Sequence, residues 1–234
     1  MTHIVFGGSN GIGKRCLELL NEEYKLDTLN IDISPTKNQD GGKVIGNLAS
    51  ESFKKQLIFK LKSIKIESIT WSIRSRSKQR ESSAIFKDCL EIEILPLIEI
   101  IENLESSILK FNSKIVIISS IAAQFVSAQN PAYNMTKSVI EAYVKCMAVK
   151  FGDQSDARIN IIRPGIVSIP ERETLNTSQN NLKKLEKASV PRKSPIIADE
   201  IAALNLFLIS NKSSALNGVI INADGGESLL TSIM

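Results

Sequence analysis

Residues 3–13, HIVFGGSNGIG, decide the fold of this chain. A short apolar run ends in a glycine-rich turn, and a segment with helical periodicity follows at once. The turn consists of Gly7, Gly8, Ser9, Asn10, Gly11, Ile12 and Gly13. Glycines here permit a tight turn and let the backbone approach a pyrophosphate, which would lie against the N-terminus of the helix. Such a turn alone also fits a P-loop or a plain loop, so the neighbouring sequence has to decide.

The acidic residue Asp32 strengthens the case for a dinucleotide site. It ends the second apolar run and follows Gly13 by nineteen residues. A carboxylate at this place accepts hydrogen bonds from an adenosine ribose and repels a 2′-phosphate. Asn10 offers no charge to a 2′-phosphate; Lys14 and Arg15 could offer one, although basic residues at the start of a helix are more often solvated. The pattern favours NAD over NADP.

Apolar runs and helical segments alternate along the chain. Strands are predicted over residues 3–6, 28–31, 43–45, 66–71, 114–119, 158–162 and 218–222. Helices are predicted over residues 13–23, 51–62, 82–109, 132–151 and 198–209. This alternation predicts an α/β fold, a doubly wound, Rossmann-type parallel sheet of seven strands flanked by helices. We expect a single domain over residues 1–234, without internal repeats.

Residues 168–195 interrupt the alternation. The segment is polar, contains three of the seven prolines and carries a short helical run around residues 180–187. We predict that it is a mobile lid over the substrate.

The composition argues against several classes of function. The chain has 43% hydrophobic and 23% charged residues, which is typical of a soluble globular protein. Its 29 basic and 25 acidic residues give a net charge of only +4, which argues against nucleic acid or a membrane surface as a partner. No apolar run approaches the length of a bilayer span, and an apolar strand begins directly after Met1. We therefore expect a cytoplasmic protein.

Cysteine and histidine usage bears on metal and redox chemistry. Cys16, Cys89 and Cys146 are odd in number and have no metal-ligand spacing, so they are expected to be reduced thiols of the core. The single histidine, His3, argues against a histidine-based metal site or triad.

Tyr133 and Lys137 are the main candidates for catalysis. They stand four residues apart in a predicted helix, so the phenol and the ammonium lie on one face, one turn apart. Ser120 follows a buried strand, thirteen residues before Tyr133. Because ligands bind at the carboxyl ends of the strands in such a sheet, all three should face the same crevice as the glycine loop. The alternative is a surface pair on an amphipathic helix.

Four motifs in sequence order resemble those of the short-chain dehydrogenase/reductase family. They are the glycine loop, Ser120 with Tyr133-x-x-x-Lys137, Arg163-Pro164-Gly165, and Ala223-Asp224-Gly225-Gly226. Tyr-x-x-x-Lys alone is frequent by chance. The four motifs at the family spacing are specific, and the resemblance covers essentially the whole chain.

The resemblance implies an NAD(P)-dependent oxidoreductase that interconverts a carbonyl and a secondary alcohol on a small-molecule substrate. It makes Tyr133 the general acid/base, Ser120 a ligand of the same substrate oxygen, and Lys137 a ligand of the nicotinamide ribose that makes the phenol more acidic. A cation about 4 Å away supplies about 4 kcal/mol at an effective dielectric near 20, but only about 1 kcal/mol in water. The lysine therefore suffices only in a partly closed site. Cofactor contacts are implied at the glycine loop, Asp32, Asn47, Leu48, Tyr133, Lys137, Pro164, Gly165 and Ile166.

Three features of the family are missing. The family's fourth strand ends in Asn-Asn-Ala-Gly, where residues 71–74 are Trp-Ser-Ile-Arg. The asparagine that holds a relay water beside the lysine falls on Glu93, which we count among the catalytic residues as a substitute relay or a partner of Lys137. Ile169 replaces a threonine that bonds the carboxamide. These departures leave open a second interpretation, an impaired relative that binds NAD without turnover.

Two further alternatives concern the helix and the enzyme class. Pro96 frees the carbonyl of Ile92 and should bend the helix over residues 82–109, as the family's helix is bent. Sugar-nucleotide epimerases share Tyr-x-x-x-Lys, but they usually have a Gly-x-x-Gly-x-x-Gly loop and a much longer substrate region.

The loop over residues 74–80, RSRSKQR, carries four basic residues at the carboxyl end of a strand. Arg74 at its start should face the crevice and bind an anionic substrate, such as a phosphorylated or acidic sugar or a carrier-linked acyl group. The alternative is a solvated basic loop. Wide apolar stripes over residues 82–109 and 132–151 predict a homodimer or homotetramer through those helices.

Overall fold

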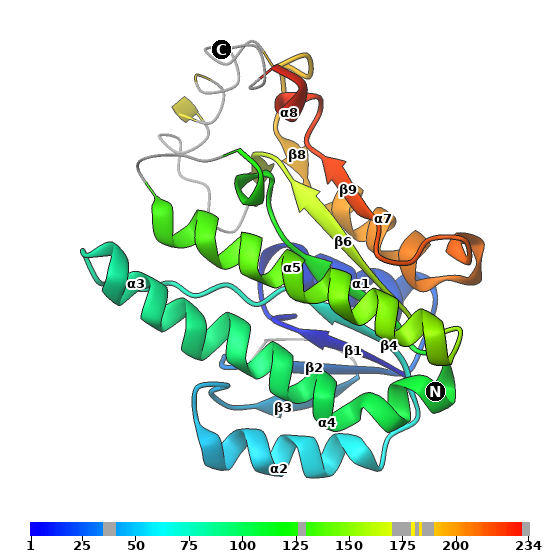
Figure 1. The fold of residues 1–234 in the computed structure, drawn as a ribbon. Helices are drawn as coiled ribbons and strands as arrows, with labels where there is room; N and C mark the ends of the chain where they lie inside the picture. The colour runs from blue at the N-terminus through cyan, green and yellow to red at the C-terminus, as the bar shows by residue number, and fades with distance from the viewer. Residues whose placement is uncertain (35–40, 126–129, 170–178, 181–182, 184–189, 231–234) are drawn as a thin grey trace.

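The computed structural model describes residues 1–34, 41–125, 130–169, 179–180, 183 and 190–230. Its centre is the parallel seven-stranded sheet that the sequence predicts (Figure 1), and the structure gives the strand order β3-β2-β1-β4-β5-β6-β9. The strands are β1 (Thr2–Phe6), β2 (Thr28–Asp32), β3 (Gly42–Ile45), β4 (Ile66–Trp71), β5 (Lys114–Ile118), β6 (Arg158–Pro164) and β9 (Ile220–Ala223). The chain crosses from β3 back over β1 and β2 to β4, so a crevice opens between the carboxyl ends of β1 and β4.

Helices cover both faces of the sheet (Figure 1). The helices are α1 (Gly11–Glu18), α2 (Glu51–Lys62), α3 (Ser82–Cys89), α4 (Leu95–Phe111), α5 (Pro131–Gln154), α7 (Ala198–Ile209) and α8 (Glu227–Leu230). One apolar core joins the sheet to α2, α4 and α5, and a second joins it to α1 and α7. Doubly wound sheets are built in this way.

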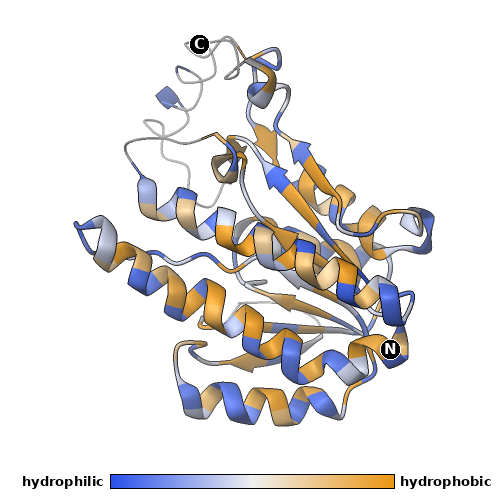
Figure 2. Ribbon diagram, in the orientation of Figure 1, coloured by the Kyte–Doolittle hydropathy of each residue, from blue (hydrophilic) through white to orange (hydrophobic). Residues whose placement is uncertain are grey.

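Strand β5 shows why the sheet has two cores. Ile115 and Ile117 pack into the core on the α4 and α5 side, whereas Val116 and Ile118 pack into the core on the α1 and α7 side. Successive side chains of a strand point to opposite faces, so the consecutive apolar residues of β5 contribute to both cores. Figure 2 shows hydrophobic colouring over much of the central strands, interrupted at polar positions.

The predicted helix over residues 82–109 is not one regular helix. It consists of α3, the π-helical turn η2 (Leu90–Ile94) and α4, which runs on to Phe111. Pro96 lies at the start of α4 and cannot donate a backbone hydrogen bond to the carbonyl of Ile92. A π turn here accommodates the missing bond, so the expectation of one continuous α-helix is corrected.

Other boundaries also differ from the sequence predictions. The predicted helix at 13–23 begins at Gly11, and its last five residues form the π-helical turn η1 (Leu19–Glu23). A small second sheet pairs β7 (Val167–Ser168) with β8 (Ile196–Ile197), which alternation could not predict because each strand has only two residues. Most of the predicted lid, residues 168–195, lies outside the described residues.

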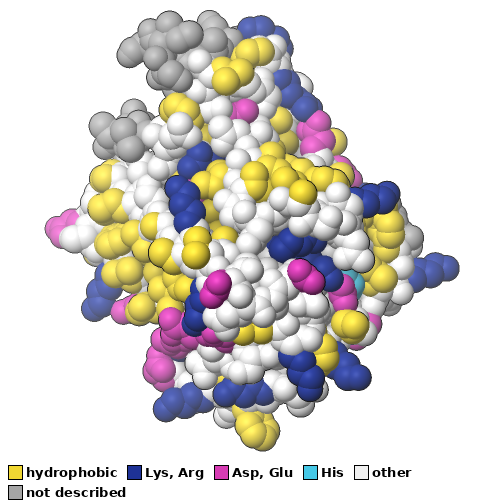
Figure 3. All heavy atoms as spheres, turned by 45° about the vertical axis from the view of Figure 1, so that its right-hand side comes forward, with side chains coloured by type: hydrophobic (Ala, Val, Ile, Leu, Met, Phe, Trp, Pro, Cys, Tyr) yellow, Lys and Arg dark blue, Asp and Glu magenta, His cyan; other side chains and the backbone are white. Residues whose placement is uncertain are grey.

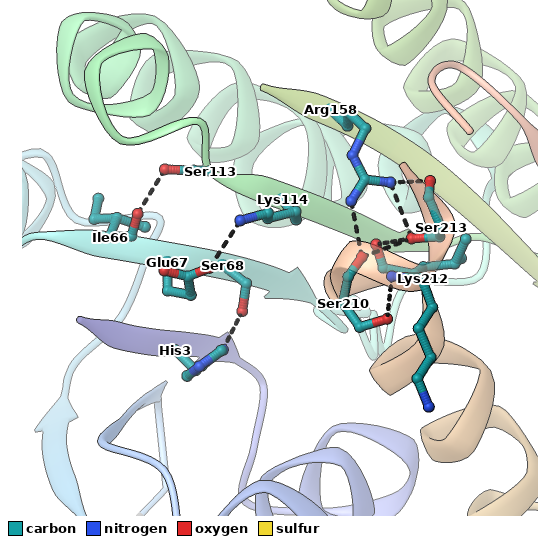
Figure 4. A network of polar contacts seen from close by, with 11 residues as sticks. His3, Ile66, Glu67, Ser68, Ser113, Lys114, Arg158, Ser210, Lys212 and Ser213 are labelled. Carbon is teal, nitrogen blue, oxygen red and sulfur yellow. Dashed lines mark hydrogen bonds and ion pairs between the residues drawn. The ribbon is translucent and has the colours of Figure 1, made fainter. Parts of the chain in front are cut away.

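A polar network lies at the amino ends of the central strands, opposite the crevice (Figure 4). His3 of β1 shares a 2.8 Å hydrogen bond between its Nδ1 and Ser68 Oγ of β4. Lys114 of β5 pairs with Glu67, with its Nζ 2.8 Å from Oε1. The Arg158 guanidinium of β6 donates to the carbonyls of Ser210 and Ser213, which follow α7. The first two contacts link β1 to β4 and β5 to β4, and the Arg158 bonds link β6 to the segment that follows α7.

The expectation that all three cysteines lie in the core is wrong for Cys146. That residue is exposed on α5, while Cys16 and Cys89 are buried. Burial raises the pKa of the Cys16 thiol to about 12, so it is inert. No helix among the described residues is long and apolar enough to cross a membrane. Figure 3 shows basic and acidic side chains interspersed over one face of the protein.

Candidate active site

A cavity of about 490 Å³ opens at the carboxyl ends of the strands. It extends from the glycine loop and the end of β2, past the ends of β4, β5 and β6, to the start of α5. Of the residues singled out in the sequence, those lining it are Gly7, Asn10, Ile12, Asp32, Asn47, Leu48, Arg74, Ser120, Tyr133, Lys137, Pro164, Gly165 and Ile169. The fold thus gathers one set of candidates from seven separate segments.

The glycine loop is compact enough to require glycine. Gly7 has φ +82°, and a Cβ there would lie 2.8 Å from the carbonyl oxygen of Ser72 at the end of β4. A Cβ at Gly13 would lie 2.2 Å from the Gly7 carbonyl oxygen. The side chain of Asn30 in β2 accepts a hydrogen bond from the Gly8 N–H through its Oδ1 at 3.0 Å. Sequence analysis missed this buried amide, which holds the loop against the sheet.

Asp32 lies where the loop and the end of β2 meet. Its Oδ2 accepts a hydrogen bond from the Ser9 N–H at 2.9 Å, and its Oδ1 accepts one from the Ile33 N–H at 2.7 Å. The carboxylate therefore orders the loop as well as lining the cavity.

Tyr133 and Lys137 lie one turn apart at the start of α5, and both line the cavity. Asn130 caps this helix by accepting a hydrogen bond from the Tyr133 N–H, which fixes where the helix begins. Ser120, just after β5, accepts a hydrogen bond from the Ala122 N–H at 3.2 Å through its Oγ. Its hydroxyl proton remains available to donate into the cavity.

Glu93 forms a fully buried ion pair with the lysine. Its Oε2 is 2.8 Å from Lys137 Nζ, and the two side chains are 0% and 3% exposed. The other carboxylate oxygen accepts the Ser75 N–H at 2.7 Å. Glu93 does not line the cavity; it lies behind Lys137 on η2 and joins that lysine to the loop after β4.

Burial acts to lower the pKa of the Lys137 ammonium. The charge of Glu93, the charge of Tyr133 and the hydrogen bond to Glu93 outweigh it, so the pKa of Lys137 is raised above its usual value. The positive charge of Arg74 acts in the opposite sense. Lys137 is thus fully protonated near neutrality, with a carboxylate as its direct partner.

Arg74 lies over the ring of Tyr133. Its Cζ is 4.7 Å from the ring centroid, and Lys137 Nζ is 5.6 Å from the same centroid. Guanidinium groups stack on aromatic faces in this way. Arg74 is exposed, so it contacts the ring and lines the cavity while staying open to solvent. Arg76 also lines the cavity, but Lys78 and Arg80 do not.

A buried carboxylate, that of Glu141, stabilises the part of the cavity formed by the ends of β5 and β6. Glu141 on α5 accepts hydrogen bonds from Ser119 Oγ at 2.7 Å and from Arg163 Nε at 2.8 Å. This network binds the end of β5 and the end of β6 to α5, so it positions the segments that bear Ser120 and Gly165. Sequence analysis missed Glu141, since a single acidic residue on a helix carries no signal.

Several predicted residues do not line the cavity. Gly8, Ser9, Gly11 and Gly13 form the turn beneath it, where a ligand would meet backbone atoms only. Ile166 follows Gly165, and its N–H donates to Glu227 Oε2 at 3.3 Å. The lining also includes residues that were not predicted as site residues: Ile33, Ser34, Gly46, Ser72, Ile73, Ser75, Ile92, Ile118, Ser119 and Val167.

Fold and site together define a doubly wound α/β protein of the Rossmann type. Residues 64–228, more than half of the chain, match the family model described as enoyl-(acyl carrier protein) reductase. The chain therefore belongs to the short-chain dehydrogenase/reductase family, as its four motifs indicate.

Individual relatives agree with this assignment. The chain is 33% identical over 135 residues to the oxidoreductase UcpA of Escherichia coli K12, covering 54% of this chain and 50% of that protein. It is 26% identical over 151 residues to the NADH-dependent enoyl-[acyl-carrier-protein] reductase FabI of Buchnera aphidicola subsp. Schizaphis graminum, covering 64% and 57%. The chain spans about half the length of the curated relatives it matches.

One solved structure aligns over nearly the whole chain. A short chain dehydrogenase family protein from Francisella tularensis subsp. tularensis SCHU S4 has a TM-score of 0.83 and 25% identity, with 97% of this chain and 98% of that chain covered. The described fold thus matches an experimentally determined fold from end to end.

Proposed function

We propose that this protein is an NAD-dependent oxidoreductase that interconverts a carbonyl and a secondary alcohol. One observation carries the proposal: Ser120, Tyr133 and Lys137 line the same cavity as the glycine loop and Asp32. A residue for proton transfer, a hydroxyl donor and a dinucleotide cradle therefore share one cavity.

The residues present fit a nicotinamide dinucleotide. A Cβ at Gly7 or Gly13 would collide with a backbone oxygen, so the turn stays tight and its backbone N–H groups lie at the N-terminus of α1 beside the cavity. Asp32 at the end of β2 suits a ribose with free hydroxyls and repels a 2′-phosphate. Lys14 and Arg15, the possible partners of a 2′-phosphate, form ion pairs with Glu18 and Asp199. These contacts support NAD over NADP, and the Buchnera relative is named as an NADH enzyme.

When bound, the nicotinamide supplies or accepts the hydride. Tyr133 then gives a proton to the carbonyl oxygen during reduction, or takes it from the hydroxyl during oxidation. Ser120 donates a hydrogen bond to the same oxygen, and Lys137 holds the nicotinamide ribose. Glu93 orients Lys137 and stands where a relay to solvent would begin. Positioned general acid–base groups of this kind contribute about 10²–10⁴-fold in rate.

The substrate that the cavity suits best is small and anionic. Arg74 and Arg76 line it, and among the described residues no carboxylate pairs with Arg74. Ile118, Val167 and Ile169 give the opposite wall an apolar character. A sugar acid, a sugar phosphate or an acyl group with a negatively charged end meets both requirements.

A second candidate is a protein that binds NAD without turnover. The buried Glu93–Lys137 pair favours it, because the carboxylate offsets the cation that should make Tyr133 more acidic. Ile169 on the cavity wall also lacks the hydroxyl expected by resemblance; its loss costs about 0.5–1.5 kcal/mol of cofactor binding, at most about tenfold.

Tyr133→Phe tests the two candidates. Wild-type protein should exchange deuteride between labelled NADH and at least one member of an anionic alcohol and ketone panel. Tyr133→Phe should lose that exchange by about 10²–10⁴-fold and keep its NADH affinity by fluorescence titration. Exchange that survives in the variant contradicts the role of Tyr133. NADH binding without exchange in the wild type supports the second candidate.

A further inference from the structure

The net charge beside Tyr133 comes from three side chains, those of Lys137, Glu93 and Arg74, and not from a single lysine. Lys137 contributes one positive charge, but Glu93 lies 2.8 Å from it and is 0% exposed, so the pair is close to neutral as a unit. Arg74 adds a second positive charge over the Tyr133 ring. The three groups sum to a single positive charge, which is the value that an unpaired lysine would provide.

We propose that Arg74 is the cation that stabilises the Tyr133 phenolate in this protein, and that it compensates for the buried carboxylate of Glu93. The inference rests on the proposed acid/base role of Tyr133. It assigns Arg74 an electrostatic function that is separate from substrate binding. A stacked guanidinium presents its face to the ring, and its five N–H groups lie in its plane, so stacking consumes none of its donors.

The other titratable groups of the site do not supply this charge. Cys89 on α3 lies close enough to sense Glu93 and Lys137, but burial raises the pKa of its thiol and keeps it neutral. Arg76 lines the same cavity. Among the described residues, however, the cationic groups that lie over the Tyr133 ring are those of Arg74 and Lys137. The positive charge of Arg74 acts to lower the pKa of Lys137, although the pKa is raised overall by Glu93 and Tyr133.

Coulomb's law gives the size of the effect. A unit charge about 5 Å from a phenolate moves its ionisation midpoint by about 0.5 to 2.5 pH units as the effective dielectric falls from about 80 to about 20. Arg74 is exposed, so we expect the lower part of this range, about half a unit to one unit.

The experiment is a pH titration of the substrate-free protein labelled with ¹³C at the tyrosine Cζ. The chain has three tyrosines, and Tyr133→Phe assigns the signal. Arg74→Gln should raise the Tyr133 midpoint by about half a unit to one unit, and Arg74→Lys should keep most of the wild-type value. Glu93→Gln should lower the midpoint, and the double variant should return toward wild type, since Lys137 then stands alone. Arg80→Gln, on the same loop outside the cavity, is the matched control.

An unchanged midpoint in Arg74→Gln, or a shift no larger than in Arg80→Gln, overturns the inference. Arg74 is on an exposed loop, so Arg74→Gln decides the question even where Glu93→Gln does not fold. The titration needs no turnover, so it fails independently of the proposed function. If the expected shifts occur without any deuteride exchange, the proposed oxidoreductase activity is refuted and the charge compensation by Arg74 is supported. If exchange occurs without the shifts, the activity is supported and the charge compensation is refuted.

Discussion

Removing the charge of Lys137 should destabilise the fold, and this can be measured without a substrate. Lys137→Met keeps the length and apolar stem of the side chain but leaves Glu93 without its partner. Both side chains are buried, at 3% and 0% exposure, so solvent cannot replace the lost contact. Breaking such a pair costs about 3–5 kcal/mol, a large part of a typical total stability of about 5–15 kcal/mol.

The pH dependence follows from the raised pKa of Lys137. A lysine whose folded pKa lies above its usual 10.5 contributes stability that is fully present below 10.5 and is lost as the pH rises through the folded pKa. At pH 7 the wild type therefore has the full stabilisation that the charged Lys137 contributes. In Lys137→Met the unpaired Glu93 should take up a proton on folding, so the loss should shrink as the pH falls.

A double-mutant cycle measures the coupling between the two charges. Its four proteins are the wild type, Lys137→Met, Glu93→Gln and the double variant, each unfolded with urea at pH 7. Lys137→Met/Glu93→Gln removes both charges and should recover much of the loss. The matched control is Lys150→Met. Lys150 lies on α5, as Lys137 does, and it pairs with Glu105 of α4. That pair is partly exposed, at 41% and 24%, so its loss should cost at most about 1 kcal/mol after screening. A loss below about 1 kcal/mol in Lys137→Met, or no coupling in the cycle, would refute the buried-pair argument.

Four other outcomes are expected. Asp32→Ala should relax a preference for NADH over NADPH in binding titrations, and equal binding of both cofactors to the wild type would contradict the assignment. Arg74→Ala should raise KM for an anionic substrate by about 10- to 100-fold, from a lost charge-assisted bond of about 1.5–3 kcal/mol, with NADH affinity unchanged. His3 should make the fold less stable as the pH falls from 6.5 through its folded pKa, because burial outweighs Glu67 and lowers that pKa; His3→Gln should remove this slope in urea unfolding between pH 7 and 5, whereas an unchanged slope would exclude His3 as its source. Light scattering should give a dimer or tetramer, since Leu95 of α4 and Val149 of α5 expose apolar side chains; a monomeric mass at micromolar concentration would argue otherwise.

Local patterns were sufficient for the architecture. Alternating apolar runs and helical periods predict the parallel sheet, because a strand buried on both faces is mostly apolar, as β5 is from Ile115 to Ile118. The glycine positions are predictable for a similar reason: Gly7 and Gly13 meet backbone atoms at distances that exclude a Cβ. The π turn before α4 was only half predictable, since Pro96 indicates a missing bond but not how the helix absorbs it.

The main candidates for catalysis were also accessible from sequence. Tyr133 and Lys137 share one helix face, and Ser120 follows a strand end, so their neighbourhood depends on regular geometry alone. This places them in one cavity.

The charge balance of the site was decided only by tertiary packing. Glu93 and Lys137 are 44 residues apart, and whether they bond directly or through water depends on how η2 packs against α5. The stacking of Arg74 on Tyr133 likewise depends on the path of the loop after β4, which no period constrains. Sequence determines which charges are available, because it determines the residue types. Only the fold brings the charges within a few ångströms of one another and removes the water between them, and the strength of a charge interaction depends on both distance and dielectric.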